Sequence, residues 1–348
     1  SIFTRNSDGT INLYDPPIIF EITSDPLFAD ARLIAEVWDM ASYQLGRSFP
    51  GITWFQWNGQ FRDDLRAFVR GDDGMIDTVM RRLYGSDDLF PEAESYHPYQ
   101  SVNFITSHDG FTLYDLVSYS TKHNEANGHR NSDGTDFNVS WNCGFEGSRG
   151  VPEEVSALRE RQAKNFCALL FLSNGTPMLR AGDEFLQTQN GNNNPYNQDN
   201  ETSWLDWELL KKNNGALRFF KEMIAFRKAH PSLCRSRFWR EEVRWYGAGG
   251  KEVDRSPGSH TLAFFLGGAS RQDDDLYVMI NAGPRDQPFT LPEEGSGGWL
   301  RVIDTALPSP QDILTPGREA PLNRATYEAK GRSVVVFARP ARSGGASS

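Results

Sequence analysis

The sequence predicts an α/β fold in which a barrel of parallel strands is followed by a separate antiparallel β domain. Three short apolar runs in the first half of the chain end at acidic residues: at Glu36, at His108-Asp109 and at Asp183-Glu184. In barrels of parallel strands, functional residues project from the carboxyl ends of the strands. From about residue 234, short apolar runs alternate with Gly, Pro and Asp turns, which is typical of antiparallel sheets.

The elements of the first part alternate between strand and helix. Helices are predicted where apolar residues recur at helical spacing, and strands where short apolar runs lie between turn signals. The predicted strands occupy residues 32–36, 53–58, 101–105 and 176–180, and the predicted helices occupy 59–70, 75–84, 154–172 and 217–230. Only four strand-then-helix units are present, whereas a closed barrel of this kind needs eight strands.

The acidic residues at the strand ends have two interpretations. A single Asp after a strand most often caps the helix that follows it. Three such ends in register, one of them with His108 beside Asp109 and another with Trp38 close to Glu36, favour a functional site instead.

The negative charge of the chain argues against two classes of binding partner. The chain has 348 residues, with 46 acidic against 36 basic side chains and a formal charge of −10. Nucleic acids and anionic membranes need a basic face on their partners, so neither is expected. With no apolar run of membrane-spanning length and no signal peptide, we expect a soluble protein of the bacterial cytoplasm. Cys143, Cys167 and Cys234 are widely spaced, so we expect reduced thiols without a metal or redox role.

Aromatic and amide residues near the predicted strand ends suggest a sugar site. Apolar ring faces pack on a pyranose, and polar groups satisfy its hydroxyls. A packing or loop-anchoring role is the alternative for each of the candidate substrate contacts, which are Trp38, Tyr43, Asn58, Phe111, Tyr114, Trp141, Tyr196 and Asp199.

A long polar insert, residues 122–144, follows the third predicted strand, and a loop of this length in a compact domain is usually functional or disordered. Its Asp and Asn residues lack the order of an EF-hand loop, so no metal is predicted, although a structural calcium ion stays open. His123 and His129 lack the helical spacing of zinc ligands, and we expect hydrogen bonds to sugar or to the loop itself.

Three segments carry a family resemblance: 33–39 (Leu-Ile-Ala-Glu-Val-Trp-Asp), 103–113 (Asn-Phe-Ile-Thr-Ser-His-Asp-Gly-Phe-Thr-Leu) and 191–200 (Gly-Asn-Asn-Asn-Pro-Tyr-Asn-Gln-Asp-Asn). They resemble the α-amylase superfamily of glycoside hydrolases. The insert resembles the isoamylase and glycogen-debranching branch specifically, and the likeness extends from residue 1 to about residue 281.

The resemblance implies a (β/α)8 TIM barrel followed by a β-sandwich. Residues 1–233 would then be the C-terminal half of the barrel, with strands five to eight. Residues 234–342 would be the antiparallel β-sandwich domain, and residues 343–348 a flexible tail. On this mapping Glu36 resembles the general acid/base, Asp109 the transition-state stabiliser and His108 a residue that hydrogen-bonds substrate.

The family's nucleophilic aspartate lies at the tip of strand four, in a Gly-Phe-Arg-Phe-Asp type motif. Residues 1–5, Ser-Ile-Phe-Thr-Arg, resemble the segment just after it. No residue of this chain is therefore assigned as nucleophile. We expect the N-terminal half of the enzyme as a preceding or separate polypeptide.

The resemblance implies retaining hydrolysis of α-1,6 branch linkages in glycogen or amylopectin-like glucans, with no cofactor. A 4-α-glucanotransferase or an α-1,4-glucan hydrolase would use the same site. The alternative from another class is a catalytically silent glucan-binding or regulatory subunit.

Overall fold

The computed structural model describes residues 2–39, 41–291 and 298–340, so the predicted tail at 343–348 lies outside the described residues. Its first part is built on a four-stranded parallel sheet with the order β1-β2-β3-β4. The strands are β1 (Ile34–Ala35), β2 (Phe55–Asn58), β3 (Ser101–Asn103) and β4 (Thr176–Pro177). All are shorter than predicted: β1 and β2 enter the hydrogen-bonded ladder two residues later than predicted, and β1, β3 and β4 leave it earlier.

Helices follow the strands along the chain. The segment before β1 contains α1 (Pro17–Ser24), and the later helices are α2 (Gly59–Arg70), α3 (Ile76–Tyr84), α4 (Leu113–Leu116), α5 (Glu153–Leu172), α6 (Leu209–Lys212) and α7 (Asn214–Ala229). The prediction for α2 is confirmed at both ends. Asn58 caps its first turn, and Gly71 ends it in the left-handed conformation, with φ +97°.

The second part contains a six-stranded antiparallel sheet with the order β10-β9-β12-β7-β6-β5 and a two-stranded sheet of β8 and β11. Five of these strands match predicted runs, whereas β5, β10 and β11 were not predicted. The strands are β5 (Val243–Tyr246), β6 (Thr261–Leu266), β7 (Asp275–Asn281), β8 (Gln287–Thr290), β9 (Leu300–Asp304), β10 (Ala320–Pro321), β11 (Thr326–Ala329) and β12 (Ser333–Arg339).

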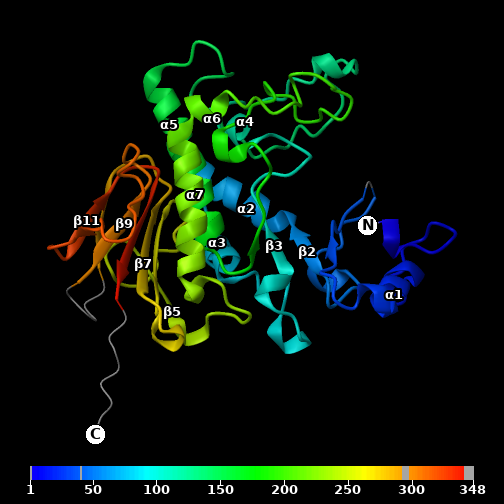
Figure 1. Ribbon diagram of the computed structural model, residues 1–348, viewed down its shortest axis with the longest axis horizontal. Helices are drawn as coiled ribbons and strands as arrows, with labels where there is room; N and C mark the ends of the chain where they lie inside the picture. The colour runs from blue at the N-terminus through cyan, green and yellow to red at the C-terminus, as the bar shows by residue number, and fades with distance from the viewer. Residues whose placement is uncertain (1, 40, 292–297, 341–348) are drawn as a thin grey trace, which may run out of the picture.

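The six-stranded sheet is buried on both faces. In β7, Val278 and Ile280 join the main hydrophobic core, whereas Tyr277 and Met279 point to a second core shared with β8 and β11. Helices α5 and α7 stand between this sheet and the parallel sheet (Figure 1). The main core therefore runs without interruption from α2, through α5 and α7, into β6, β7 and β12.

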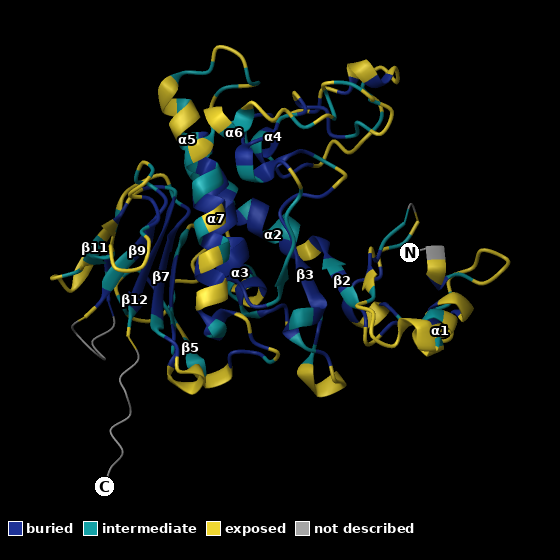
Figure 2. Cartoon of the chain, in the orientation of Figure 1, coloured by how far each residue is buried: buried dark blue, intermediate teal, exposed yellow. Residues whose placement is uncertain are grey.

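The N-terminal segment is much less buried than the middle of the molecule (Figure 2). The middle of the molecule is mostly buried, whereas the N-terminal segment around α1 extends beyond β2 and is largely exposed (Figure 2). All three cysteines are free thiols, as predicted, with Cys143 and Cys167 buried. No helix in the described part of the chain is both long and apolar enough to cross a lipid bilayer.

Candidate active site

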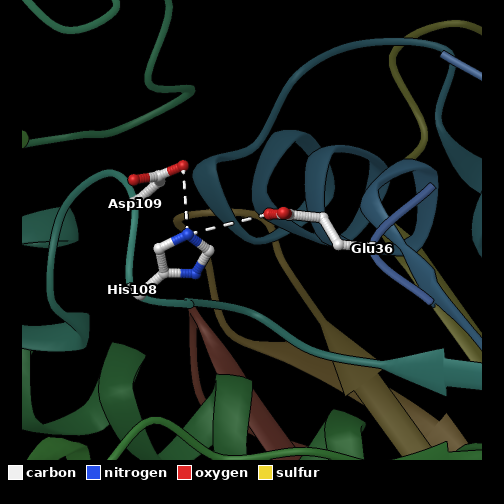
Figure 3. A group of neighbouring side chains, drawn as sticks. All are labelled: Glu36, His108 and Asp109. Carbon is white, nitrogen blue, oxygen red and sulfur yellow. Dashed lines mark ion pairs between the residues drawn. The ribbon is translucent and has the colours of Figure 1, made fainter. Parts of the chain in front are cut away.

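Glu36, His108 and Asp109 converge beyond the carboxyl ends of β1 and β3. Figure 3 shows the imidazole of His108 between the two carboxylates. Its Nε2 lies 3.7 Å from Glu36 Oε1 and 3.4 Å from Asp109 Oδ2. The side chains of Glu36, His108 and Asp109 are 39%, 58% and 65% exposed, so a substrate can reach all three.

The same three residues could also share a cation. They form a group in the described ranges whose ligand atoms lie within 4.8 Å of one another, an arrangement that exposed acidic residues commonly adopt without a metal. The structure therefore brings the three predicted catalytic residues together, and their catalytic roles stay a prediction.

Glu36 and Asp109 line one cleft of about 490 Å³. Its walls combine acidic and apolar side chains, namely Phe3, Ile19, Ile34, Ala35, Glu36, Trp38, Asp39, Phe49, Trp54 and Asp109. Asp39 is already engaged, because its carboxylate accepts hydrogen bonds from Arg5 Nη2 at 2.9 Å and from the backbone N–H of Ala41 at 2.9 Å. These contacts hold the pKa of Asp39 well below its usual range. Asp39 therefore ties the chain's first residues to the loop after β1.

An aromatic cluster supports the histidine. The Trp57 ring lies 5.7 Å from the His108 ring, and Trp38 and Phe104 pack on Trp57 at 6.1 and 5.8 Å between ring centroids. Trp57 was not among the predicted site residues. The alternation of β2 could have identified it, since Trp57 and Asn58 are consecutive strand residues and must face opposite sides of the sheet.

Two predicted substrate contacts were wrong. Asn58 is fully buried: its Oδ1 accepts from the Phe61 N–H at 2.8 Å, and its Nδ2 donates to Ser101 Oγ at 2.8 Å. Asn58 therefore caps the first turn of α2 instead of contacting substrate, a common role for a polar residue that follows a strand. Phe111 is also fully buried, in the main core, because its large apolar ring gains more from burial than from exposure at a rim.

Asp183, the third predicted strand-end acid, is also absent from the cleft, because it is only 2% exposed. Its neighbour Glu184 instead accepts a hydrogen bond from the N–H of Gly182 at 2.9 Å. The expectation that three strand ends present acids at one rim therefore holds for two of them.

The other predicted contacts are dispersed. Tyr43 is half exposed and packs on Trp38 at 5.9 Å, close to the cleft. Tyr114 lies partly buried below Arg159, with 5.9 Å from the guanidinium carbon to the ring. Trp141 is partly buried, and the guanidinium carbon of Arg332 lies 4.2 Å from its ring centroid, so one face of the ring is covered.

Tyr196 and Asp199 are exposed on the loop after β4. The hydroxyl of Tyr196 lies 2.7 Å from Nε2 of His129, and Asp199 accepts a hydrogen bond from Trp204 Nε1 at 3.0 Å. Both residues stay available to a ligand.

The polar insert is ordered by amide hydrogen bonds to the loop after β4. The N–H of Asn193 donates to Asn124 Oδ1 at 2.9 Å, and Asn127 Nδ2 donates to the carbonyl of Asn194 at 2.9 Å. Nε2 of His123 lies 3.6 Å from Oε1 of Glu146, and Nε2 of His129 contacts the Tyr196 hydroxyl. The two histidines thus make the loop-stabilising contacts that were one of the two roles expected of them.

Residues 242–338 match the family described as "Isoamylase, C-terminal". Over 345 residues, which is 98% of this chain and 43% of the relative, the sequence is 40% identical to "Isoamylase 3, chloroplastic" of Oryza sativa subsp. japonica. The predicted kinship with isoamylases is confirmed. A "Glycogen debranching enzyme" of Dickeya chrysanthemi is 42% identical over 279 residues, or 78% of this chain and 40% of that protein.

Among solved structures, a pullulanase from Paenibacillus barengoltzii in complex with maltohexaose and α-cyclodextrin has a similar fold. Its TM-score is 0.65 at 26% identity, over 93% of this chain and 46% of the pullulanase. The chain thus spans less than half the length of the isoamylase and debranching relatives described here.

Proposed function

We propose that this chain carries part of the active site of an α-glucan debranching hydrolase that cleaves α-1,6 branch linkages of glycogen or amylopectin. The observation that carries the proposal is the convergence of Glu36, His108 and Asp109, whose two carboxylates line one exposed cleft. The names of the related isoamylase and glycogen debranching enzyme support the choice of reaction.

In the proposed mechanism, Glu36 in its protonated form gives a proton to the departing glycosidic oxygen. An aspartate from a segment N-terminal to residue 1 attacks the anomeric carbon and forms a glycosyl ester. Glu36, now a carboxylate, then removes a proton from the water that hydrolyses this ester. Asp109 and His108 would hold hydroxyls of the reacting sugar while its ring flattens in the oxocarbenium-like transition state.

We further infer that β1–β4 are the C-terminal half of a (β/α)8 barrel. Among the residues that the structure describes, no further strand pairs with the sheet's edges at β1 and β4, and open edges favour pairing with further strands. Nine of the fifteen large apolar side chains that are exposed in the described residues lie at residues 3–34, on the side of β1: Phe3, Ile11, Leu13, Tyr14, Ile18, Phe20, Leu27, Phe28 and Ile34. Apolar exposure on this scale is typical of a surface that another body covers.

The position of Phe3 supports the same source for the nucleophile. Phe3 lines the cleft together with Glu36 and Asp109. A segment that precedes it, in the same chain or as a separate polypeptide, would reach the cleft directly.

A 4-α-glucanotransferase or an α-1,4-glucan hydrolase would use the same residues, because a sugar can replace water as the acceptor in a retaining mechanism. Chain-length analysis of digested amylopectin separates these activities. Linear chains released without shortening support debranching, and redistributed chain lengths support transfer.

The test of the proposed function is Glu36→Gln in the enzyme that comprises this chain and its preceding segment. We expect turnover of amylopectin to fall by about 10²- to 10⁴-fold, because the amide cannot transfer the proton. Binding of maltohexaose should be retained. Turnover by the unaltered enzyme separates it from a silent glucan-binding subunit, which would bind maltohexaose without cleaving amylopectin. Glu154→Gln, at an exposed position in α5, is the matched control. Undiminished activity of Glu36→Gln would remove the assigned role.

A further inference from the structure

The segment that carries His108 and Asp109 has no regular secondary structure. It leaves β3 after Asn103 and enters α4 at Leu113, so ladder hydrogen bonds do not fix its shape. A site built on such a loop needs other contacts to hold its side chains in place. Residues from other segments of the chain supply those contacts.

A single buried carboxylate binds both ends of this loop. Asp183 Oδ2 accepts a hydrogen bond from Thr106 Oγ1, and Asp183 Oδ1 accepts from the N–H of Leu113 at 2.9 Å. Thr106 lies two residues before His108, and Leu113 lies four residues after Asp109. Asp183 itself lies in the segment after β4, on a different part of the chain.

Two further contacts complete the attachment of the loop. Arg66 of α2, also buried, donates from Nε and Nη2 to the carbonyl of Ile105 at 2.9 and 2.6 Å. The N–H of Gly110 donates to the carbonyl of Asn193 at 3.0 Å. Of these three attachments, Asp183 is the one that spans the loop, because it binds both before and after the His108-Asp109 pair.

We propose that Asp183 is a positioning residue that sets the place of His108 and Asp109 in the cleft. The inference rests on the proposed function of the cleft. The Leu113 N–H can only donate, so Asp183 Oδ1 must accept from it, whereas the Thr106 hydroxyl can donate or accept. Replacement of Asp183 by Asn can keep both hydrogen bonds, whereas replacement by Ala removes both and releases the two ends of the loop.

The surroundings of Asp183 are consistent with this role. Burial raises the pKa of its carboxyl, whereas Arg180, with Nη1 3.8 Å from Oδ1, acts in the opposite direction. A second buried aspartate, Asp115 of α4, makes the reciprocal connection. It accepts hydrogen bonds from the Thr188 hydroxyl and from the Gln189 N–H, the latter at 2.8 Å. The loops after β3 and β4 thus hold each other through two carboxylates.

The test uses Asp183→Ala in the enzyme that comprises this chain and its preceding segment. Displacement of catalytic groups by about 1 Å costs on the order of 10²-fold in rate. We therefore expect kcat on amylopectin to fall by about 10- to 100-fold with KM within about twofold, because the cleft walls other than Asp109 keep their contacts. Full kcat in Asp183→Ala would overturn the inference.

Thr106 supplies a milder pair of variants in case Asp183→Ala does not fold. Thr106→Ser keeps the hydroxyl and should keep kcat, whereas Thr106→Val keeps the shape, loses the hydrogen bond and should lower kcat. Equal kcat in the two variants would also overturn the inference.

Two controls separate this role from simple loss of stability. Asp312→Asn removes a carboxylate that is just as buried but pairs with Lys164 and Arg218, so it should lower stability and leave kcat unchanged. Hydrogen exchange of residues 104–113 should quicken in Asp183→Ala and stay unchanged in Asp312→Asn; unchanged exchange in both would count against the proposal. If the unaltered enzyme does not cleave amylopectin, the proposed function fails; if it is active and Asp183→Ala is equally active, only the positioning role fails.

Discussion

Asp115 should make the stability of this protein depend on pH in an unusual direction. It is fully buried, and burial raises the pKa of its carboxyl from the ordinary 3.8 to about 6. Between these values the folded chain binds a proton that the unfolded chain does not, so this group stabilises the fold as the pH falls through 6. Each unit of difference between the folded and unfolded pKa corresponds to about 1.4 kcal/mol, so the ionised Asp115 lowers the free energy of unfolding by about 3 kcal/mol at neutral pH.

The perturbation is Asp115→Asn, which removes the titration. The free energy of unfolding of the unaltered protein, minus that of the variant, should rise by about 2 kcal/mol between pH 7.5 and pH 4.5. The loss of an acceptor for Thr188 or Gln189 adds a constant offset that cancels in this comparison. Urea unfolding of both proteins, followed by tryptophan fluorescence at the two pH values, measures this change in the stability difference. A difference that does not change with pH, or that falls at pH 4.5, would refute the reasoning.

Three further predictions concern stability and binding. Phe111→Ala should lower the free energy of unfolding by about 3 to 5 kcal/mol in urea unfolding, because it empties a fully buried ring site. Tyr196→Ala, at an exposed position, should change stability by less than about 0.5 kcal/mol and weaken maltohexaose binding in calorimetry; full affinity would remove Tyr196 from the substrate contacts. Asp312→Asn removes a fully buried carboxylate 2.8 Å from Lys164 Nζ, which keeps Glu160 at 2.6 Å, so the variant should lower the free energy of unfolding by about 1 to 3 kcal/mol. Glu94→Gln breaks an exposed ion pair and should lower it by less than about 1 kcal/mol; equal losses would contradict the difference in burial.

The sequence was sufficient where a local pattern decides the structure. The apolar spacing of residues 59–70 and the glycine at 71 determine α2, and the short continuous apolar run at 262–266 determines β6. The convergence of Glu36 with Asp109 could also be predicted, because the carboxyl ends of parallel strands meet at one edge of the sheet.

The sequence was insufficient where the fold decides which polar groups are buried. Asn58 and Asp183 look like rim residues in the sequence, since each follows an apolar run, yet each satisfies backbone N–H groups inside the molecule. The short strand β11 was missed because Thr326–Ala329 has little apolar character and is stabilised by pairing with β8. Such choices depend on partners that are distant along the chain.

The uninterrupted core between α5, α7 and the six-stranded sheet has a consequence for recombining such enzymes. A cut near residue 234 would pass through packed side chains, with Phe166 and Phe219 on one side and Val278 and Val336 on the other. Each piece would then expose apolar side chains of this core to water. Chimeras between homologues should therefore be joined with these helices and this sheet taken from the same parent.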